Sequence, residues 1–128
     1  MHVNDWKRIA EQEARRYRDN RAFIQGVLDS GGDGSDRYRM KQKWVLAVDY
    51  VLAYLHRTDA AKERFFRLCY GIEGTQKQLN EKSMVALSFA CNASVNTLYR
   101  WRSEQTTLLL IAAAQTGALR PYGIEPSP

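Results

Sequence analysis

The chain has 128 residues, of which 45% are hydrophobic and 26% charged, a balance typical of a single soluble globular domain rather than of a disordered chain. Its longest uninterrupted apolar run, residues 108–114, is far shorter than the roughly 20 residues that a membrane-spanning helix requires. Nineteen basic and fourteen acidic residues give a net charge of +5, which favours a polyanionic partner, although no block of like charge forms a basic tail.

The cysteines and the possible catalytic groups exclude several protein classes. Cys69 and Cys91 have no histidine or second cysteine close by in the sequence, so we expect neither a zinc site nor a disulfide scaffold. Residues 1–10 mix charged and apolar side chains, unlike a secretory leader, which favours a cytoplasmic protein. No catalytic triad, carboxylate pair, phosphate loop or metal motif is found, so we predict no enzyme activity, catalytic residue, metal or cofactor.

The chain is predicted to be all-α, with four to five helices, because no stretch alternates apolar and polar residues between turn signals. The first helix is a long N-terminal one within residues 1–30, capped by Asn4 or Asp5. Its apolar positions recur at helical spacing, and basic residues crowd its other side. That basic cluster either forms a solvated face or contacts phosphate or a partner. The apolar positions are Trp6, Ala10, Tyr17, Ile24 and Leu28, and the basic cluster is Arg15, Arg16, Arg18 and Arg21.

Three glycines within residues 31–34 interrupt the helical pattern, since each costs a helix about 1 kcal/mol relative to alanine. Asp29, Asp33 and Asp36 suggest a calcium loop at first sight. An EF-hand loop that began at Asp29 would, however, place Met40 where a bidentate glutamate is needed. We therefore interpret this segment as a linker.

A helical domain is predicted over residues 35–116. Ser35 caps a helix from Asp36 to about His56, and a third helix runs from Asp59 to Tyr70. Gly71 supplies the left-handed residue that ends it. The residues predicted to be buried are Trp44, Val45, Val48, Val51, Leu52, Leu55, Ala61, Phe65, Leu68 and Cys69.

Two further helices, at 84–90 and 94–115, are separated by a short break at residues 91–93. Ser94 is a typical N-cap, and Asn92 is the residue best able, after glycine, to adopt the positive φ of a tight turn. The band 108–114 is apolar on every side of the second helix, so it must be buried, either against the helices at 36–70 or in a subunit interface. Residues 117–128, with three prolines, are predicted to form a flexible tail.

Residues 84–102 resemble the helix-turn-helix of DNA-binding regulators. Five positions carry the resemblance: a small residue and an apolar residue in the first helix, the turn residue, and two apolar residues in the second helix. Serine replaces the usual alanine, cysteine the usual leucine or valine, and asparagine the usual glycine. The five are Ser88, Cys91, Asn92, Leu98 and Trp101.

The second helix of this motif carries side chains suited to reading DNA. Leu98 and Trp101 point toward the preceding helix, which leaves the other faces free. Asn96 is able to pair with adenine and Arg100 with guanine, Val95 suits a thymine methyl, and Tyr99 a phosphate. The alternative is an ordinary helical hairpin with a polar surface. The predicted DNA-binding residues are Ser94, Val95, Asn96, Thr97, Tyr99, Arg100 and Arg102.

The order of elements over roughly residues 42–116 resembles the fourth region of sigma factors, and most closely the small phage transcriptional activators of the RinA and ArpU type. The resemblance implies a phage or prophage late-gene activator in the cytoplasm of a bacterial host. It also implies double-stranded DNA and RNA polymerase as partners, whereas the sequence leaves open whether the chain is a monomer or a homodimer. Two alternatives remain: a phage small terminase subunit, which assembles into rings, and a helical protein-interaction module without nucleic-acid binding.

Overall fold

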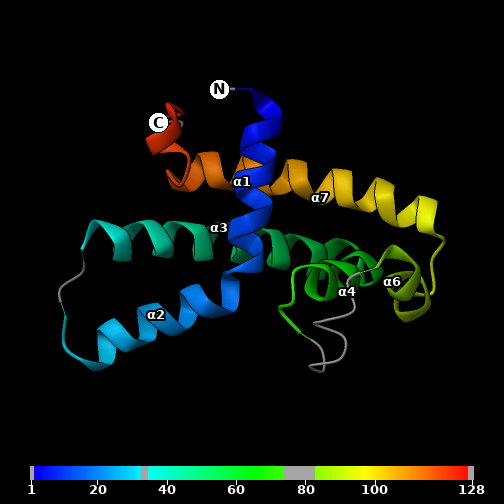
Figure 1. Cartoon of the computed structure of the whole chain (residues 1–128), viewed down its shortest axis with the longest axis horizontal. Helices are drawn as coiled ribbons and strands as arrows, with labels where there is room; N and C mark the ends of the chain where they lie inside the picture. Colours follow the sequence, from blue (N-terminus) through cyan, green and yellow to red (C-terminus); the bar gives the residue numbers. More distant parts are fainter. Residues whose placement is uncertain (1, 33–34, 74–82, 127–128) are drawn as a thin grey trace.

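A computed structural model describes residues 2–32, 35–73 and 83–126, and this part of the chain is all-α, as predicted, with no strand. It holds six α-helices rather than four or five, followed by one short 3-10 helix (Figure 1). The elements are α1 (Val3–Arg15), α2 (Tyr17–Asp29), α3 (Asp36–Thr58), α4 (Ala60–Cys69), α6 (Met84–Cys91), α7 (Val95–Thr116) and η1 (Arg120–Tyr122).

Helix α3 is the centre of the fold and packs against α1, α2, α4 and α7. It begins as predicted, because the Ser35 hydroxyl accepts a hydrogen bond from the Tyr38 amide at 3.3 Å. Its most extensive contact is with α7, which runs antiparallel to it (Figure 1). The predicted apolar positions of α3 are buried, except Val45, which is half-buried.

The N-terminal segment is two helices, so the prediction of one long helix is wrong. Helix α1 ends at Arg15, Arg16 takes φ −90° and ψ 6°, and α2 leaves in another direction (Figure 1). The bend lets α1 cross α7 and α3 while α2 packs along α3. Buried Asn20 secures it, donating to Glu13 at 3.2 Å and accepting from Lys41 at 2.9 Å.

Two smaller N-terminal predictions are also corrected. The ring Nδ1 of His2, not Asn4 or Asp5, caps α1 by accepting from the Asn4 amide at 3.2 Å. Because α2 turns away after the bend, Leu28 at the end of the expected apolar face is 55% exposed. The linker residues 33–34 lie outside the described residues.

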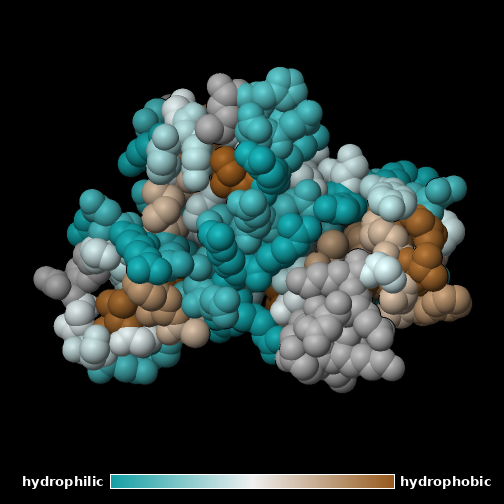
Figure 2. Space-filling model, in the orientation of Figure 1, coloured by the Kyte–Doolittle hydropathy of each residue, from teal (hydrophilic) through white to brown (hydrophobic). Residues whose placement is uncertain are grey.

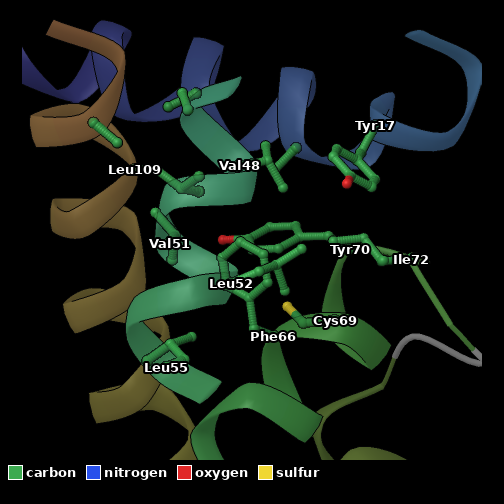
Figure 3. Close-up of a cluster of buried hydrophobic side chains, with 14 of the residues drawn as sticks. Tyr17, Val48, Val51, Leu52, Leu55, Phe66, Cys69, Tyr70, Ile72 and Leu109 are labelled. Carbon is green, nitrogen blue, oxygen red and sulfur yellow. The ribbon is translucent and has the colours of Figure 1, made fainter. Parts of the chain in front are cut away.

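Helix α4 begins after the Asp59 cap and ends at Cys69, close to the predicted limits, and the left-handed Gly71 follows two residues later. Phe65, Leu68 and Cys69 are buried as predicted, whereas Ala61 is exposed. Tyr70, just after the helix, is almost fully buried among α3, α4 and α7 (Figure 3). Residues 74–82, between α4 and α6, lie outside the described residues.

The apolar band of α7 packs on α3, the first of the two alternatives considered for it. Leu109 and Ala113 are completely buried, but Ile111 is 51% exposed, so the band is not buried on every side. No helix of the described residues is long and apolar enough to cross a membrane.

The predicted flexible tail is wrong for residues 117–126. Gly117, at φ 85°, reverses the chain after α7, and the Ala118 amide bonds back to Ala113 at 2.9 Å. This reversal returns Leu119, 1% exposed, to the core before η1 begins. The sequence signal for this turn was an apolar residue, Leu119, two positions after the glycine that ends α7.

Candidate nucleic-acid interface

Helices α4, α6 and the first turns of α7 pack on one another at one end of the molecule. The ring centroids of Phe65 in α4 and Trp101 in α7 lie 6.1 Å apart. Arg64 of α4 donates its Nε to the Ala90 carbonyl at 3.1 Å, near the end of α6. Helix α4 thus holds both α6 and α7, and we call residues 83–104 the α6–α7 corner.

The turn between α6 and α7 has the predicted backbone conformation. Asn92 adopts φ 52° and ψ 47° and is the one non-glycine residue with positive φ in the described chain. Its amide bonds to the Phe89 carbonyl at 3.4 Å, and the Ala93 amide bonds to the Ser88 carbonyl at 3.1 Å. These two bonds form a Schellman motif, which satisfies the last carbonyls of α6 and fixes the direction of the exit.

Helix α7 begins at the predicted cap. The Ser94 hydroxyl accepts from the Thr97 amide at 3.2 Å and bonds to the Thr97 hydroxyl at 2.9 Å. Leu98 is completely buried and Trp101 is half-buried, so both face the neighbouring helices as expected. The rotation of α7 about its axis is therefore set by Leu98 and Trp101.

Most of the predicted DNA-binding side chains lie on the outward side of α7. Ser94, Asn96 and Arg100 are exposed, and Tyr99 is 54% exposed. Val95 and Thr97 are half-buried near the cap. The sequence from 83 to 103 contains no aspartate or glutamate, so no carboxylate of this stretch would repel a phosphate.

Arg102, also among the predicted DNA-binding residues, is paired with another helix of the chain. Its Nε and Nη2 atoms each lie 3.1 Å from Oε2 of Glu11 in α1. Burial lowers the pKa of Arg102, but the charge and hydrogen bond of Glu11 outweigh burial and raise it. Because Glu11 is 91 positions away in the sequence, local spacing gave no sign of this contact.

The four N-terminal arginines are engaged in different local contacts and do not form one basic patch. Arg15 lies 3.7 Å from Glu11 and 5.9 Å from the Tyr70 ring centroid, and Arg16 pairs with Glu13 at 3.2 Å. Arg21 stacks over Tyr17 at 5.6 Å, and it lines a hollow beside α2 and α3 together with exposed Arg18. Ion pairs and stacking within the chain fit the solvated-face alternative better than a phosphate-binding cluster.

A groove beside the exposed turns of α7 was not predicted. It has a volume of about 570 Å³ and runs between the end of α3, the start of α4 and α7. An ion pair of 2.8 Å between Lys62 and Glu104 crosses it. The hydrogen bond to Glu104 raises the pKa of Lys62, which keeps the pair charged. The groove lining includes Tyr54, Leu55, Trp101 and Leu108.

The two thiols and the acidic groups give no sign of a reactive centre in the described residues. Burial raises the pKa of both Cys69 and Cys91, which disfavours the thiolate form that a nucleophile or metal ligand requires. Within residues 2–32, 35–73 and 83–126, no three His, Cys, Asp or Glu side chains gather in a way that could hold a metal ion.

No family model, curated protein or solved structure matches this chain.

Proposed function

We propose that residues 84–102 form a helix-turn-helix and that the protein is a sequence-specific DNA-binding regulator of transcription. The α6–α7 corner carries the proposal. It buries Leu98 on the inner side of α7 and presents Asn96, Tyr99 and Arg100 on the outer side. A helix presented in this way, with no carboxylate from residue 83 to 103, fits the surface of a polyanionic duplex.

The first turns of α7 would enter the major groove, which is about 12 Å wide and admits an α-helix. Asn96 would form paired hydrogen bonds with an adenine edge, and Arg100 with the acceptors of guanine. Ser94 and the free amides at the start of α7 would bind a backbone phosphate, and Tyr99 a neighbouring one. Phosphate contacts fix the position on DNA, whereas the base contacts supply the specificity.

The regulator would act as a phage or prophage late-gene activator, as the sigma-like order of elements implies. In that role it would bind a promoter and engage RNA polymerase. If it binds as a homodimer, its two copies of α7 would lie about 34 Å apart, one helical turn of DNA. Mass in solution separates this from a small terminase subunit, because a ring would greatly exceed the mass of a dimer.

The test begins by selecting DNA duplexes with wild-type protein from a random-sequence library. Affinity for the selected duplex is then measured for Asn96→Ala and Arg100→Ala. Each change removes one proposed base contact and should weaken binding by about 1–3 kcal/mol. Arg8→Ala is the matched control for Arg100→Ala, because it removes the same charge from an exposed site on α1. Unchanged affinity in both α7 variants would contradict the proposal.

A protein-interaction module is the second candidate, and two exposed apolar residues of α6 favour it. Val85 is 59% exposed and Phe89 is 83% exposed, one helical turn later. Apolar residues are visible at this end of the molecule in Figure 2. DNA binding should weaken steeply as salt concentration rises, whereas a module of this kind would show no salt-dependent retention on DNA.

A further inference from the structure

We propose that Glu11 of α1 is a positioning residue that holds the exposed turns of α7 in the orientation needed to read DNA. This inference rests on the proposed function and adds a role for the N-terminal helix. The structure connects Glu11 with Arg102, which follows the proposed base-contacting Arg100 by two residues.

One carboxylate oxygen of Glu11 receives contacts from Arg102 of α7, from Tyr70 just after α4 and from Arg15 of its own helix. Two nitrogens of Arg102 lie 3.1 Å from it, the Tyr70 hydroxyl donates to it at 3.4 Å, and Arg15 lies at 3.7 Å. The Glu11 side chain is 16% exposed, and that of Arg102 is 38% exposed. Because the carboxylate is largely covered and two nitrogens of Arg102 lie at hydrogen-bonding distance from it, this pair should be stronger than an ordinary surface pair.

Leu98 and Trp101 anchor the exposed turns of α7 by apolar packing, but these turns have few polar anchors of their own, so the Glu11 contact adds a constraint that packing does not supply. Within the described residues, the side chains of 95–101 make no hydrogen bond or ion pair with another helix. The nearest polar links are Arg102 to α1 on one side and Glu104 to Lys62 of α4 on the other. The Lys62–Glu104 pair is the more exposed of the two ion pairs, so we expect the Glu11–Arg102 pair to constrain α7 more strongly.

The geometry also explains why α1 crosses α7 at all. The bend at Arg16 releases α1 from the direction of α2, and α1 then lies over α7 and α3 (Figure 1). Buried Ala10 and Ala14 allow this close approach, and Glu11 lies between them in the sequence, within the same crossing. Helix α1 therefore lies across α7, and we call its contact with α7 through Ala10, Glu11 and Ala14 the clasp.

Glu11→Gln tests the proposal, because loss of positioning and the change in net charge predict opposite changes in DNA affinity. The change raises the net charge from +5 to +6, so simple electrostatics would strengthen binding to any duplex. Loss of positioning predicts the opposite for the selected duplex: about tenfold weaker binding, with affinity for a scrambled duplex equal or higher. The readout is therefore the ratio of the two affinities, which a general loss of stability in a still-folded protein would not change.

Tyr17→Phe is the matched control. It removes one hydrogen bond, from the Tyr17 hydroxyl to Asp49, at the α2–α3 contact rather than at α7. Its affinity ratio should equal that of wild type. The proposal is overturned if Glu11→Gln keeps the wild-type ratio, or if both variants lose specificity equally. Arg102→Lys, which keeps the charge but offers fewer donors, should lie between wild type and Glu11→Gln.

Amide hydrogen exchange separates failure of this proposal from failure of the proposed function. Glu11→Gln should speed exchange in the first half of α7, from about Leu98 to Arg102, whereas Tyr17→Phe should not. If wild-type protein selects no duplex, DNA reading fails, and faster exchange still supports the clasp. If exchange in α7 is the same in wild type and Glu11→Gln, the clasp is disproved whatever the DNA result.

Discussion

The body of the molecule and the α6–α7 corner keep their shapes by different means. In the body, formed by α1, α2, α3 and residues 105–119, large apolar side chains such as Val48, Leu109 and Leu119 are at most 1% exposed. In the corner, α6 buries a single residue, Leu87. The shape of the corner also depends on backbone hydrogen bonds around Asn92, on the Ser94 cap and on a few contacts from α1 and α4.

This difference predicts how each region responds to change. Burial energy in the body is shared among helices far apart in the sequence, so a cavity there should destabilise the whole domain. The corner depends on a few local conformational preferences, each worth less energy but each setting the direction of α7. Substitutions in the body should therefore change the free energy of unfolding most. Substitutions in the corner should have their largest effect on the proposed DNA binding.

Leu109→Ala should produce the largest loss of stability. Leu109 is completely buried in α7 among α3 and its neighbours (Figure 3). Its truncation should lower the free energy of unfolding by about 2–5 kcal/mol, because a cavity remains. Urea unfolding followed by circular dichroism measures the change. Ile111→Ala is the control, since Ile111 is 51% exposed and should cost less than half as much; equal losses would remove the distinction between these two sides of α7.

Asn92→Val should have the largest effect in the corner. A β-branched residue at φ 52° is strained, and the cost should be about 1–2 kcal/mol. Asn92→Gly removes this strain and should be at least as stable as wild type. The same urea experiment compares the three proteins. If Asn92→Val is as stable as Asn92→Gly, the turn does not require the left-handed conformation.

Tyr17→Phe probes a buried polar contact in the body and should cost about 1 kcal/mol at neutral pH. Burial, and then the hydrogen bond to Asp49, raise the pKa of Tyr17 to about 12. The unfolded chain loses this proton near pH 10, so the contribution is complete below that pH and is lost as the pH rises toward 12.

Unfolding in urea from about pH 9 to about pH 12 tests this sign. The stability of wild type should fall over that window, and that of Tyr17→Phe should fall less steeply. Burial also raises the pKa of Tyr70, so the variant should keep part of the slope. Identical slopes would show that the Tyr17 hydroxyl is not held in its neutral form by the fold.

The corner was the more predictable region, because its signals are local. Asparagine before a serine cap, between two apolar segments, predicted the positive φ at Asn92 and the start of α7. The caps at Ser35 and Gly71 were predictable for the same reason. The apolar character of the band 108–114 predicted that it would be covered, but it left open whether by α3 and its neighbours or by a second subunit.

The errors and omissions concern contacts between distant segments. No glycine or proline marks the bend at Arg16, which follows from the packing of α1 on α7 and of α2 on α3. Arg102 lies on a helix whose neighbouring residues face outward, and only the arrival of α1 shows that it pairs with Glu11. Spacing along one helix predicts which residues share a face, but it does not predict which other helix covers that face.

Lys62→Met should have the smallest effect and is the sharpest check on the difference between the two regions. Its pair with Glu104 is short, at 2.8 Å, but the two side chains are 32% and 46% exposed. Pairs of this kind contribute less than about 1 kcal/mol, because water screens the charges and ordering two long side chains costs entropy. Urea unfolding at low and high salt measures the contribution, which should vanish at high salt. A loss as large as that of Leu109→Ala would mean that this exposed ion pair, and not local backbone geometry, holds the corner together.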